Sequence, residues 1–347
     1  MASTRDAAVL GAGSWGTALA THLGSTGHQV SLWARDPALV SEMRERRANP
    51  TYLPDITFPD ELHLEASLDE ALVGARFVIF AVPSHGLRGI ARAAADRLAP
   101  DAVLVSASKG IEEGTLRRMS EVLQEETGRR HPIVVLSGPS FASEVARGLP
   151  TALVSASTDC EAVRAVQKEF RGPAFRLYGS DDVTGVEVGA ALKNIIAIAA
   201  GVVESLHLGH NATAALMTRG LAEITRLAVA MGGRDETLAG LGGLGDLVLT
   251  CTGSLSRNRH VGVELGHGRP LESVLAGMRM VAEGVRTTTA ALALGEHYRV
   301  ELPIAAQMAE VLAGRRTASD AVGCLMLRPQ RGEFDRRAAP RAPTGAG

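Results

Sequence analysis

The chain has 347 residues, a length that favours two domains over one. Hydrophobic residues make up 46% of it and charged residues 21%, which is typical of a globular protein able to bury a full core. The formal net charge is −2, so the composition gives no support to binding of nucleic acid or of an anionic membrane surface.

The first strand and the loop after it predict a dinucleotide-binding site. Residues 1–6 are polar and lead straight into the apolar strand Ala7–Leu10, which leaves no room for a signal-peptide core and indicates a cytoplasmic protein. Next come Gly11-Ala-Gly13-Ser-Trp-Gly16 and a helical run from Thr17 to Leu23. Between a strand and a helix, such glycines permit a tight turn, the approach of a pyrophosphate and close packing of helix on strand. A glycine-rich turn in an unrelated α/β protein is the alternative.

The end of the second predicted strand bears on the choice of coenzyme. Strand Gln29–Trp33 is followed by Ala34, Arg35 and Asp36. An acid at this position suits the ribose 2′-hydroxyl of NAD, whereas an arginine suits the 2′-phosphate of NADP. Asp36 is also a good N-cap, because Pro37 stands at the first position of the next helix. Arg35 therefore favours NADP and leaves NAD open.

Strands and helices alternate over the first 180 residues, which predicts a doubly wound, mostly parallel sheet. Residues 49–62 are expected to form a proline-bearing loop, and Ser67-Leu-Asp-Glu70 matches a capping box that opens a short helix. Lys109 follows a strand directly, at the edge where open parallel sheets bind ligands, although a solvated lysine is equally compatible with this position. The further predicted strands span residues 77–82, 103–106, 133–136, 152–155 and 175–178.

The stretch from Val186 to Val203 is almost wholly apolar or small, yet it contains Lys193. Burial of an ammonium lowers its pKa or requires a partner, unless the side chain extends to the surface. Glu187, Lys193 and Asn194 interrupt the run, so a membrane span is not expected. Because α/β segments precede this helix and helices follow it, Lys193 stands where a two-domain enzyme would have its cleft.

The second half is predicted to be helical, with a loop at residues 208–211 and an amphipathic run over 212–231. His207 and His210 have no third ligand nearby, and the three cysteines are widely spaced, so neither a metal site nor a disulfide is predicted. The glycines of 240–245 before Asp246 indicate a backbone that lies close to something else, whether chain or ligand is not specified by the pattern. Ser256 is a predicted N-cap, and Arg257 beside it suits a phosphate, although an ordinary capped helix with solvated arginines is equally compatible.

Several of these motifs together resemble bacterial NAD(P)-dependent glycerol-3-phosphate dehydrogenases, from Val9 to about Leu327. The resemblance rests on VLGAGSWGTALA, FAVPSH, ASKGIE, LSGPSFASEVARGLPTA, GAALKNIIAIAAG, GLGDLVLTCTGSLSRNR and VAEGVRTT. Other dehydrogenases share the first glycine loop but not this set. The resemblance implies a Rossmann-like α/β domain over residues 1–183, an all-α domain over 184–328 and a cleft between them. The tail, 329–347, departs from the family pattern and is expected to be disordered.

The resemblance also implies roles for individual residues, with Lys193 as the catalytic acid/base. The implied substrate-binding residues are Lys109, Gly138, Ser140, Lys193, Asp246, Thr250, Ser256, Arg257 and Asn258. The implied coenzyme-binding residues are Gly11, Gly13, Ser14, Trp15, Gly16, Arg35, Lys109, Ala142, Arg257, Val281 and Glu283.

The activity implied by the resemblance is interconversion of dihydroxyacetone phosphate and sn-glycerol 3-phosphate by hydride transfer at C2, supplying glycerol 3-phosphate for phospholipids. The expected partner is a small phosphate ester, with no nucleic acid and no membrane insertion, and a homodimer is compatible with the chain. Two alternatives stay open. A related 3-hydroxyacid or sugar-acid dehydrogenase would lack the SRNR segment, and a non-enzymatic NAD(P)-sensing module would have no reason to keep Lys109, Lys193 and Asp246 together.

Overall fold

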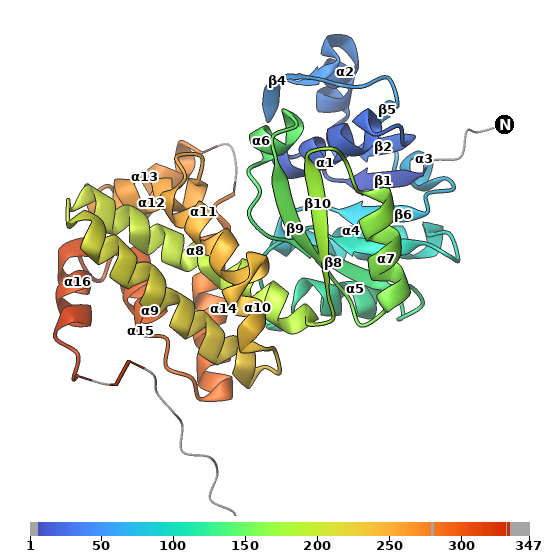
Figure 1. Cartoon of the computed structure of the whole chain (residues 1–347). Helices are drawn as coiled ribbons and strands as arrows, with labels where there is room; N and C mark the ends of the chain where they lie inside the picture. The colour runs from blue at the N-terminus through green and yellow to red at the C-terminus, as the bar shows by residue number, and fades with distance from the viewer. Residues whose placement is uncertain (1–5, 279–280, 331, 334–347) are drawn as a thin grey trace, which may run out of the picture.

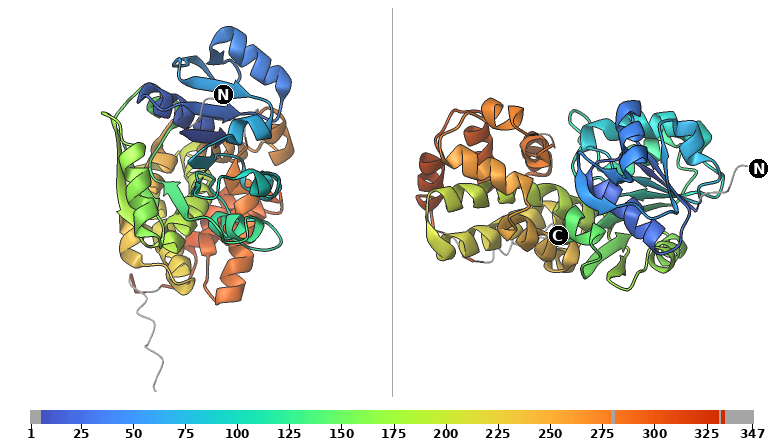
Figure 2. Two further views of the ribbon diagram at one scale, coloured as in Figure 1. Left: turned by 90° about the vertical axis from the view of Figure 1, so that its right-hand side faces the viewer. Right: turned by 90° about the horizontal axis from the view of Figure 1, so that it is seen from above.

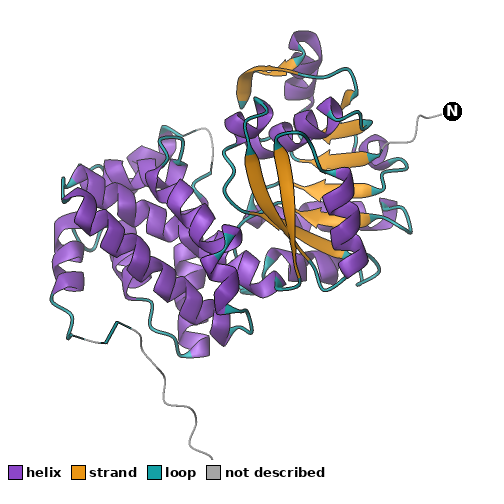
Figure 3. Ribbon diagram, viewed as in Figure 1, coloured by secondary structure: helices purple, strands orange, loops and turns teal. Residues whose placement is uncertain are grey.

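The chain folds into one lobe that contains the strands and a second lobe of helices. The computed structural model describes residues 6–278, 281–330 and 332–333. Within them the last strand ends at Ser180, and the first helix of the second lobe begins at Val183. The two lobes lie side by side (Figures 1, 2 and 3). The predicted class, an α/β part followed by an all-α part, is confirmed.

An eight-stranded sheet runs through the first lobe. Its strands are β1 (Ala7–Leu10), β2 (Val30–Trp33), β5 (Leu62–Glu65), β6 (Phe77–Phe80), β7 (Val103–Ser106), β8 (Ile133–Ser137), β9 (Thr151–Ala156) and β10 (Phe175–Ser180). The strands β3 (Ala48–Asn49) and β4 (Leu53–Thr57) form a separate two-stranded ribbon. The order of the eight strands is β10-β9-β8-β7-β6-β1-β2-β5, and all neighbours in this sheet pair parallel except β8 and β9. The separate ribbon β3–β4 is antiparallel. β1 lies between β2 and β6: the chain first continues from β1 to β2 on one side and later adds β6 on the opposite side of β1. The topological switch point therefore lies at β1.

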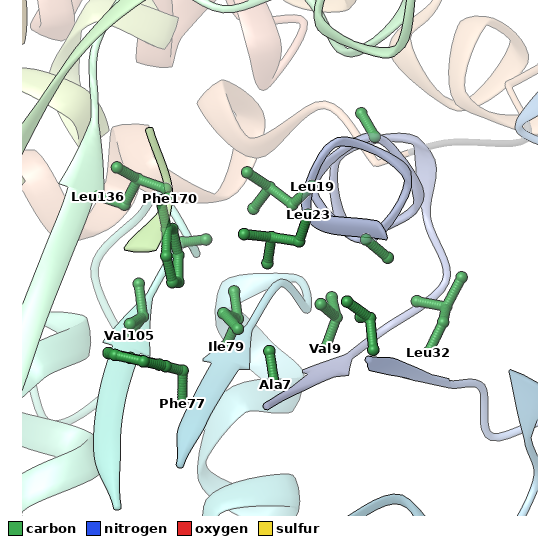
Figure 4. Close-up of a cluster of buried hydrophobic side chains, with 14 of the residues drawn as sticks. Ala7, Val9, Leu19, Leu23, Leu32, Phe77, Ile79, Val105, Leu136 and Phe170 are labelled. Atoms are coloured by element: carbon green, nitrogen blue, oxygen red, sulfur yellow. The ribbon is translucent and has the colours of Figure 1, made fainter. Parts of the chain in front are cut away.

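Helices cover both faces of this sheet, as a doubly wound fold requires. In the first lobe they are α1 (Ser14–Ser25), α2 (Pro37–Arg46), α3 (Leu68–Leu72), α4 (Ser84–Ala94), η1 (Ala95–Arg97), α5 (Met119–Glu126), α6 (Ala142–Ala146) and α7 (Cys160–Glu169). Val9 of β1 points into one core cluster with Leu19 and Leu23 of α1 (Figure 4). The next residue, Leu10, belongs to a cluster on the opposite face with Leu87 of α4. Burial on both faces explains why β1 is uninterruptedly apolar.

The helical lobe is built around α8. Its elements are α8 (Val183–Ser205), α9 (Gly209–Ala230), α10 (Asp235–Ala239), the π-helical turn η2 (Leu241–Gly245), α11 (Asp246–Thr252), α12 (Arg257–Gly266), α13 (Leu271–Ala276), α14 (Glu283–Tyr298), α15 (Pro303–Leu312) and α16 (Ala318–Met326). Every residue of α8 from Gly185 to Val203 is buried, and α9, α11, α12 and α14 all pack against it. The helix is long and apolar enough to span a membrane, but protein surrounds it on all sides, as in the core helix of a globular domain.

Two predictions about loops are wrong. Residues 49–62 form the β3–β4 ribbon and the approach to β5, since Pro54 is tolerated in a ribbon without neighbouring strands. The loop at 208–211 is shorter than expected, because α9 begins at Gly209. The short helix after Ser67 is confirmed, with the Ser67 hydroxyl accepting the Glu70 N–H at 3.4 Å. Most of the predicted disordered tail lies outside the described residues.

Helices α8 and α12 touch backbone to backbone. A Cβ added at Gly262 would lie 1.8 Å from the carbonyl oxygen of Ile198, and one added at Gly201 would lie 2.0 Å from that of Arg259. Neither carbonyl can move away without disturbing its own helix. Glycine at these two positions is therefore what lets α12 approach the helix that contains Lys193.

We predict that Gly262→Ala destabilises the protein by about 1–3 kcal/mol or more, because the added methyl group has no space. The matched control is Gly323→Ala in α16, where no described atom beyond the helix's own neighbouring backbone lies within 4 Å of the added Cβ. There alanine should be neutral or stabilising, by up to about 1 kcal/mol, because it disfavours the unfolded chain. Denaturant melts of both variants measure the difference. Equal effects at the two positions would contradict the close contact.

Candidate active site

Two lysines, one aspartate and one threonine meet where the two lobes adjoin. Lys193 Nζ lies 2.5 Å from Asp246 Oδ1 and 2.8 Å from the Thr250 hydroxyl. Lys109 Nζ donates to the other carboxylate oxygen of Asp246 at 2.8 Å. Asp246 is 1% exposed and Lys193 is 5% exposed. One buried carboxylate therefore joins a lysine of the sheet lobe to a lysine of the helical lobe.

The electrostatic environment brings the pKa of Lys193 close to neutral pH. Burial lowers the pKa of Lys193 to about 7, with the negative charge of Asp246 opposing this shift and the positive charge of Lys109 adding to it. Both forms of the amine are then populated at neutral pH, which is the condition for efficient general acid–base catalysis. The alternative of a lysine that extends to solvent is excluded.

The backbone directly before Asp246 is irregular and lies against α8. The turn η2 is π-helical, a geometry that recurs at functional sites. A Cβ at Gly189 of α8 would lie 2.7 Å from the carbonyl oxygen of Gly242, and one at Gly243 would lie 2.2 Å from that of Leu238. The glycines thus let the turn lie directly on α8. The prediction that this glycine-rich stretch lies close to something else is confirmed, and the neighbour is the backbone of α8.

Lys109 stands at the carboxyl edge of the parallel strands. It follows β7, and its Nζ also donates to the Gly138 carbonyl at 3.2 Å, beyond the end of β8. The Ser140 hydroxyl donates to the same carbonyl at 3.0 Å. The sheet edge therefore brings the predicted residues Lys109, Gly138 and Ser140 together beside Asp246.

The glycine loop after β1 has the features that a dinucleotide pyrophosphate needs. Gly11 adopts a φ of 116°, and a Cβ at Gly16 would lie 1.9 Å from the carbonyl oxygen of Gly11, so these two make the turn and the close packing. A Cβ at Gly13 would meet no atom of the described residues within 4 Å, apart from its own chain neighbours, which leaves that side of the loop open. The N-terminus of α1 has no side-chain cap and no acid in its first turn. These residues fit an anionic coenzyme.

Other predicted coenzyme residues surround this loop. The buried Trp15 Nε1 has no hydrogen-bond partner among the residues that the structure describes. Arg35 is exposed just beyond the end of β2, while Asp36 caps α2 by accepting the Ala38 N–H at 2.9 Å. Ala142 begins α6, which packs against α1. Because Asp36 is engaged in capping, Arg35 is the side chain that remains at this strand end for an adenosine ribose.

The SRNR segment begins α12. Ser256 is the N-cap, and its hydroxyl accepts the Arg259 N–H at 3.3 Å. Arg257 donates to the Val281 carbonyl at 2.9 Å. The Arg257 side chain is exposed, yet desolvation by the surrounding protein lowers the pKa of its guanidinium, with Glu283 opposing the shift. A cation that reaches solvent while lying among protein groups is available to an anionic ligand.

Asn258 and Glu283 make contacts that sequence reasoning did not predict. The Asn258 amide donates to Asn194 Oδ1 at 3.0 Å and accepts the Gly284 N–H at 3.0 Å, which ties α8, α12 and α14 together. Glu283 accepts the Ser84 hydroxyl at 2.7 Å and the Ser84 N–H at 3.1 Å, a bond between the two lobes. In the sequence, these pairs are signalled only by Asn194, a polar residue after Lys193, and by Ser84, a serine after the strand-ending Pro83. Neither signal identifies the partner residue.

The comparisons with known proteins cover most of the chain. The family described as NAD-dependent glycerol-3-phosphate dehydrogenase N-terminus matches residues 6–163, and the corresponding C-terminus matches residues 182–323. The chain belongs to this family. Glycerol-3-phosphate dehydrogenase [NAD(P)+] of Koribacter versatilis is 54% identical over 77% of this chain and 80% of the relative. That of Syntrophotalea carbinolica is 53% identical over the same shares.

A solved structure of this family has the same fold. The crystal structure of glycerol-3-phosphate dehydrogenase from Coxiella burnetii superposes with a TM-score of 0.90 at 39% identity, covering 94% of this chain and 99% of the other. Membership makes the chain an NAD(P)-dependent oxidoreductase of the glycerol-3-phosphate dehydrogenase family. The family model for the helical half includes Lys193, Asp246 and Arg257, so the resemblance extends beyond the glycine loop that many dehydrogenases share.

Proposed function

We propose that the protein interconverts dihydroxyacetone phosphate and sn-glycerol 3-phosphate, with Lys193 as the group that moves the proton at the C2 oxygen. The observation that carries the proposal is the buried cluster of Lys193, Asp246, Thr250 and Lys109. When bound, the coenzyme gives a hydride to C2 or takes one from it. The protein contributes position and a proton.

The proton transfer follows from the contacts of Lys193. In reduction, its ammonium form donates to the oxygen as negative charge develops there, and in oxidation its neutral form takes the hydroxyl proton. Asp246 and Thr250 accept from Nζ and so hold the amine in one orientation. Lys109, held by Asp246 and the Gly138 carbonyl, adds a second positive charge at the same place. Positive charge already in place when the alkoxide forms lowers the barrier.

The substrate phosphate is assigned to the start of α12. Ser256 caps this helix, whose first turn contains no acid, and Arg257 stands at its first position. A helix N-terminus supplies N–H groups to an anion, and a guanidinium adds a planar pair of donors. The phosphate does not react, so its binding energy serves to place C2 beside Lys193. Asn258 connects this helix to Asn194, the residue after Lys193.

We further propose that NADPH is the preferred coenzyme, because Arg35 stands at the end of β2 and Asp36 is engaged as a helix cap. Reduction in the cytoplasm would then supply glycerol 3-phosphate for phospholipids, a role that depletion of the protein in cells, followed by lipid analysis, would test. The activity itself is tested by loss of NADPH absorbance with dihydroxyacetone phosphate, against a panel of other keto compounds that includes the 3-oxoacids and keto sugar acids reduced by the related dehydrogenases. Turnover of that panel in preference to dihydroxyacetone phosphate would contradict the proposal.

Arg257→Ala should reduce kcat/KM for dihydroxyacetone phosphate by about ten- to a hundredfold, the effect of losing one charged hydrogen bond worth roughly 1.5–3 kcal/mol. Arg257→Lys should recover only part of this loss, because it keeps the charge without the paired donors. Unphosphorylated dihydroxyacetone serves as the control substrate and should be nearly indifferent to both changes. An equal loss for both substrates would instead assign Arg257 to the coenzyme or to the fold.

Arg35→Ala should weaken NADPH binding about ten- to a hundredfold and change NADH binding little, because only NADPH has a 2′-phosphate for the guanidinium. Steady-state KM values for the two coenzymes, measured at saturating dihydroxyacetone phosphate, give the comparison. If both coenzymes weaken equally, Arg35 contacts a part that they share and does not select between them.

A further inference from the structure

A fully buried asparagine connects the β3–β4 ribbon to the glycine loop. Asn49 is the second residue of β3, and its side chain is completely inaccessible to solvent. Its Nδ2 donates to the Ala12 carbonyl at 2.9 Å and to the Thr17 hydroxyl at 2.8 Å. Its Oδ1 accepts the Tyr52 N–H at 3.1 Å. Both Nδ2 protons thus have acceptors, and the carbonyl oxygen has a donor.

The partners of Asn49 are the backbone and first turn of the coenzyme loop. Ala12 lies between Gly11 and Gly13, and the orientation of its carbonyl is set by the peptide plane that it shares with Gly13. Thr17 stands in the first turn of α1, where its N–H donates to the Gly13 carbonyl at 2.9 Å. Asn49 therefore holds the loop and the helix start in one mutual arrangement. This arrangement determines where the N–H groups of the first turn of α1 point.

The same ribbon is fastened at three further points. The Ser14 hydroxyl donates to the Tyr52 carbonyl at 3.3 Å, a contact between the loop and the turn of the ribbon. At the opposite end, the Phe58 N–H donates to the Arg47 carbonyl at 2.8 Å, and the Arg47 guanidinium donates to the Pro59 carbonyl at 2.9 Å. The ribbon is therefore closed at its base by Arg47 and joined to the loop by Asn49. It lies beside α2, the helix that follows Arg35 (Figure 1).

We propose that Asn49 is a positioning residue for the coenzyme, which couples the β3–β4 ribbon to the glycine loop and holds that loop in its pyrophosphate-binding conformation. The proposal rests on the coenzyme binding assigned above. Asn49 stands behind the loop, with its whole side chain buried, and acts through Ala12 and Thr17 without touching the ligand. The ribbon extends the site on the adenosine side, since it adjoins the segment after β2.

This placement predicts an effect on coenzyme affinity that is separate from catalysis. None of the described hydrogen bonds of Asn49 reaches Lys193, Lys109, Asp246 or Arg257. Loss of its bonds should therefore raise Kd and KM for NADPH while kcat at saturating NADPH and KM for dihydroxyacetone phosphate stay near the wild-type values. A purely structural asparagine would lower the melting temperature and leave the NADPH affinity of the folded protein unchanged.

Thr17→Val removes one acceptor of Asn49, and Thr17→Ser restores it. The matched control is Thr127→Val in the same lobe, since Thr127 is also buried and its hydroxyl donates to the Leu123 carbonyl at 2.7 Å, at the end of α5. NADPH binding is measured by quenching of tryptophan fluorescence, for which Trp15 lies in the loop itself. We expect Thr17→Val to raise Kd about three- to tenfold, the effect of one neutral hydrogen bond, and Asn49→Ala to raise it more.

Thr17→Ser should bind NADPH like the wild type, and Thr127→Val should lower the melting temperature without changing Kd. If Asn49→Ala does not fold, the comparison of Thr17→Val with Thr17→Ser tests the proposal instead. Unchanged Kd in Thr17→Val, with a melting temperature lowered as in Thr127→Val, would overturn the role of Asn49 and leave the proposed function intact. A wild-type protein that binds neither NADPH nor NADH would overturn both.

Discussion

The structure depends on keeping one ammonium group buried in an apolar helix. Lys193 stands in the middle of α8, where every neighbour in the helix from Gly185 to Val203 is buried. A buried charge of this kind requires a partner, and here the partner is Asp246, supported by Thr250. Neither is close to Lys193 in sequence, so the helical lobe has to fold in a way that returns α11 to the middle of α8. Lys109 extends the same carboxylate contact to the sheet lobe.

Two other features of α8 fix its position against the neighbouring elements. Its small residues let neighbouring backbones come within contact: Gly189 meets the turn before Asp246, and Gly201 meets α12. Its second buried charge, Glu187, accepts from Arg118 at 2.7 Å and from the Ser120 hydroxyl at 2.6 Å, at the start of α5. Burial raises the pKa of Glu187, while Arg118 and Ser120 oppose this. One helix thus contacts the sheet lobe through the Glu187 carboxyl group and Asp246 through the Lys193 amine, so the position of Lys193 is fixed relative to the strand ends.

Many of these features could be predicted from the sequence, because each depends on the pattern of a few consecutive residues. The strand at Val9, the glycine loop, the cap at Ser256 and the unusual Lys193 are all features of short segments. The β3–β4 ribbon could not be predicted, since Pro50 and Pro54 favour a loop and the ribbon is stabilised by Asn49 and Arg47 through distant partners. The hydrogen bond between Ser84 and Glu283 joins residues 199 positions apart, and the periodicity of a sequence cannot predict a contact between residues so far apart. Contacts between side chains of the two lobes depend on the tertiary structure, so they can be identified only when the relative position of the lobes is known.

The central claim, that Lys193 moves the proton, is tested most directly by pH profiles of kcat/KM in both directions for the wild type and Asp246→Asn. Reduction needs the ammonium form and should fall as pH rises through about 7, whereas oxidation needs the neutral amine and should rise over the same range. Because Asp246 raises the pKa of Lys193, its replacement should move both midpoints to lower pH, while the ionisation of the substrate phosphate stays the same in both proteins. Lys193→Met should lose about 10²–10⁴-fold in rate and retain neither midpoint. Midpoints that do not move in Asp246→Asn, or a Lys193→Met profile of unchanged shape and height, would contradict the account.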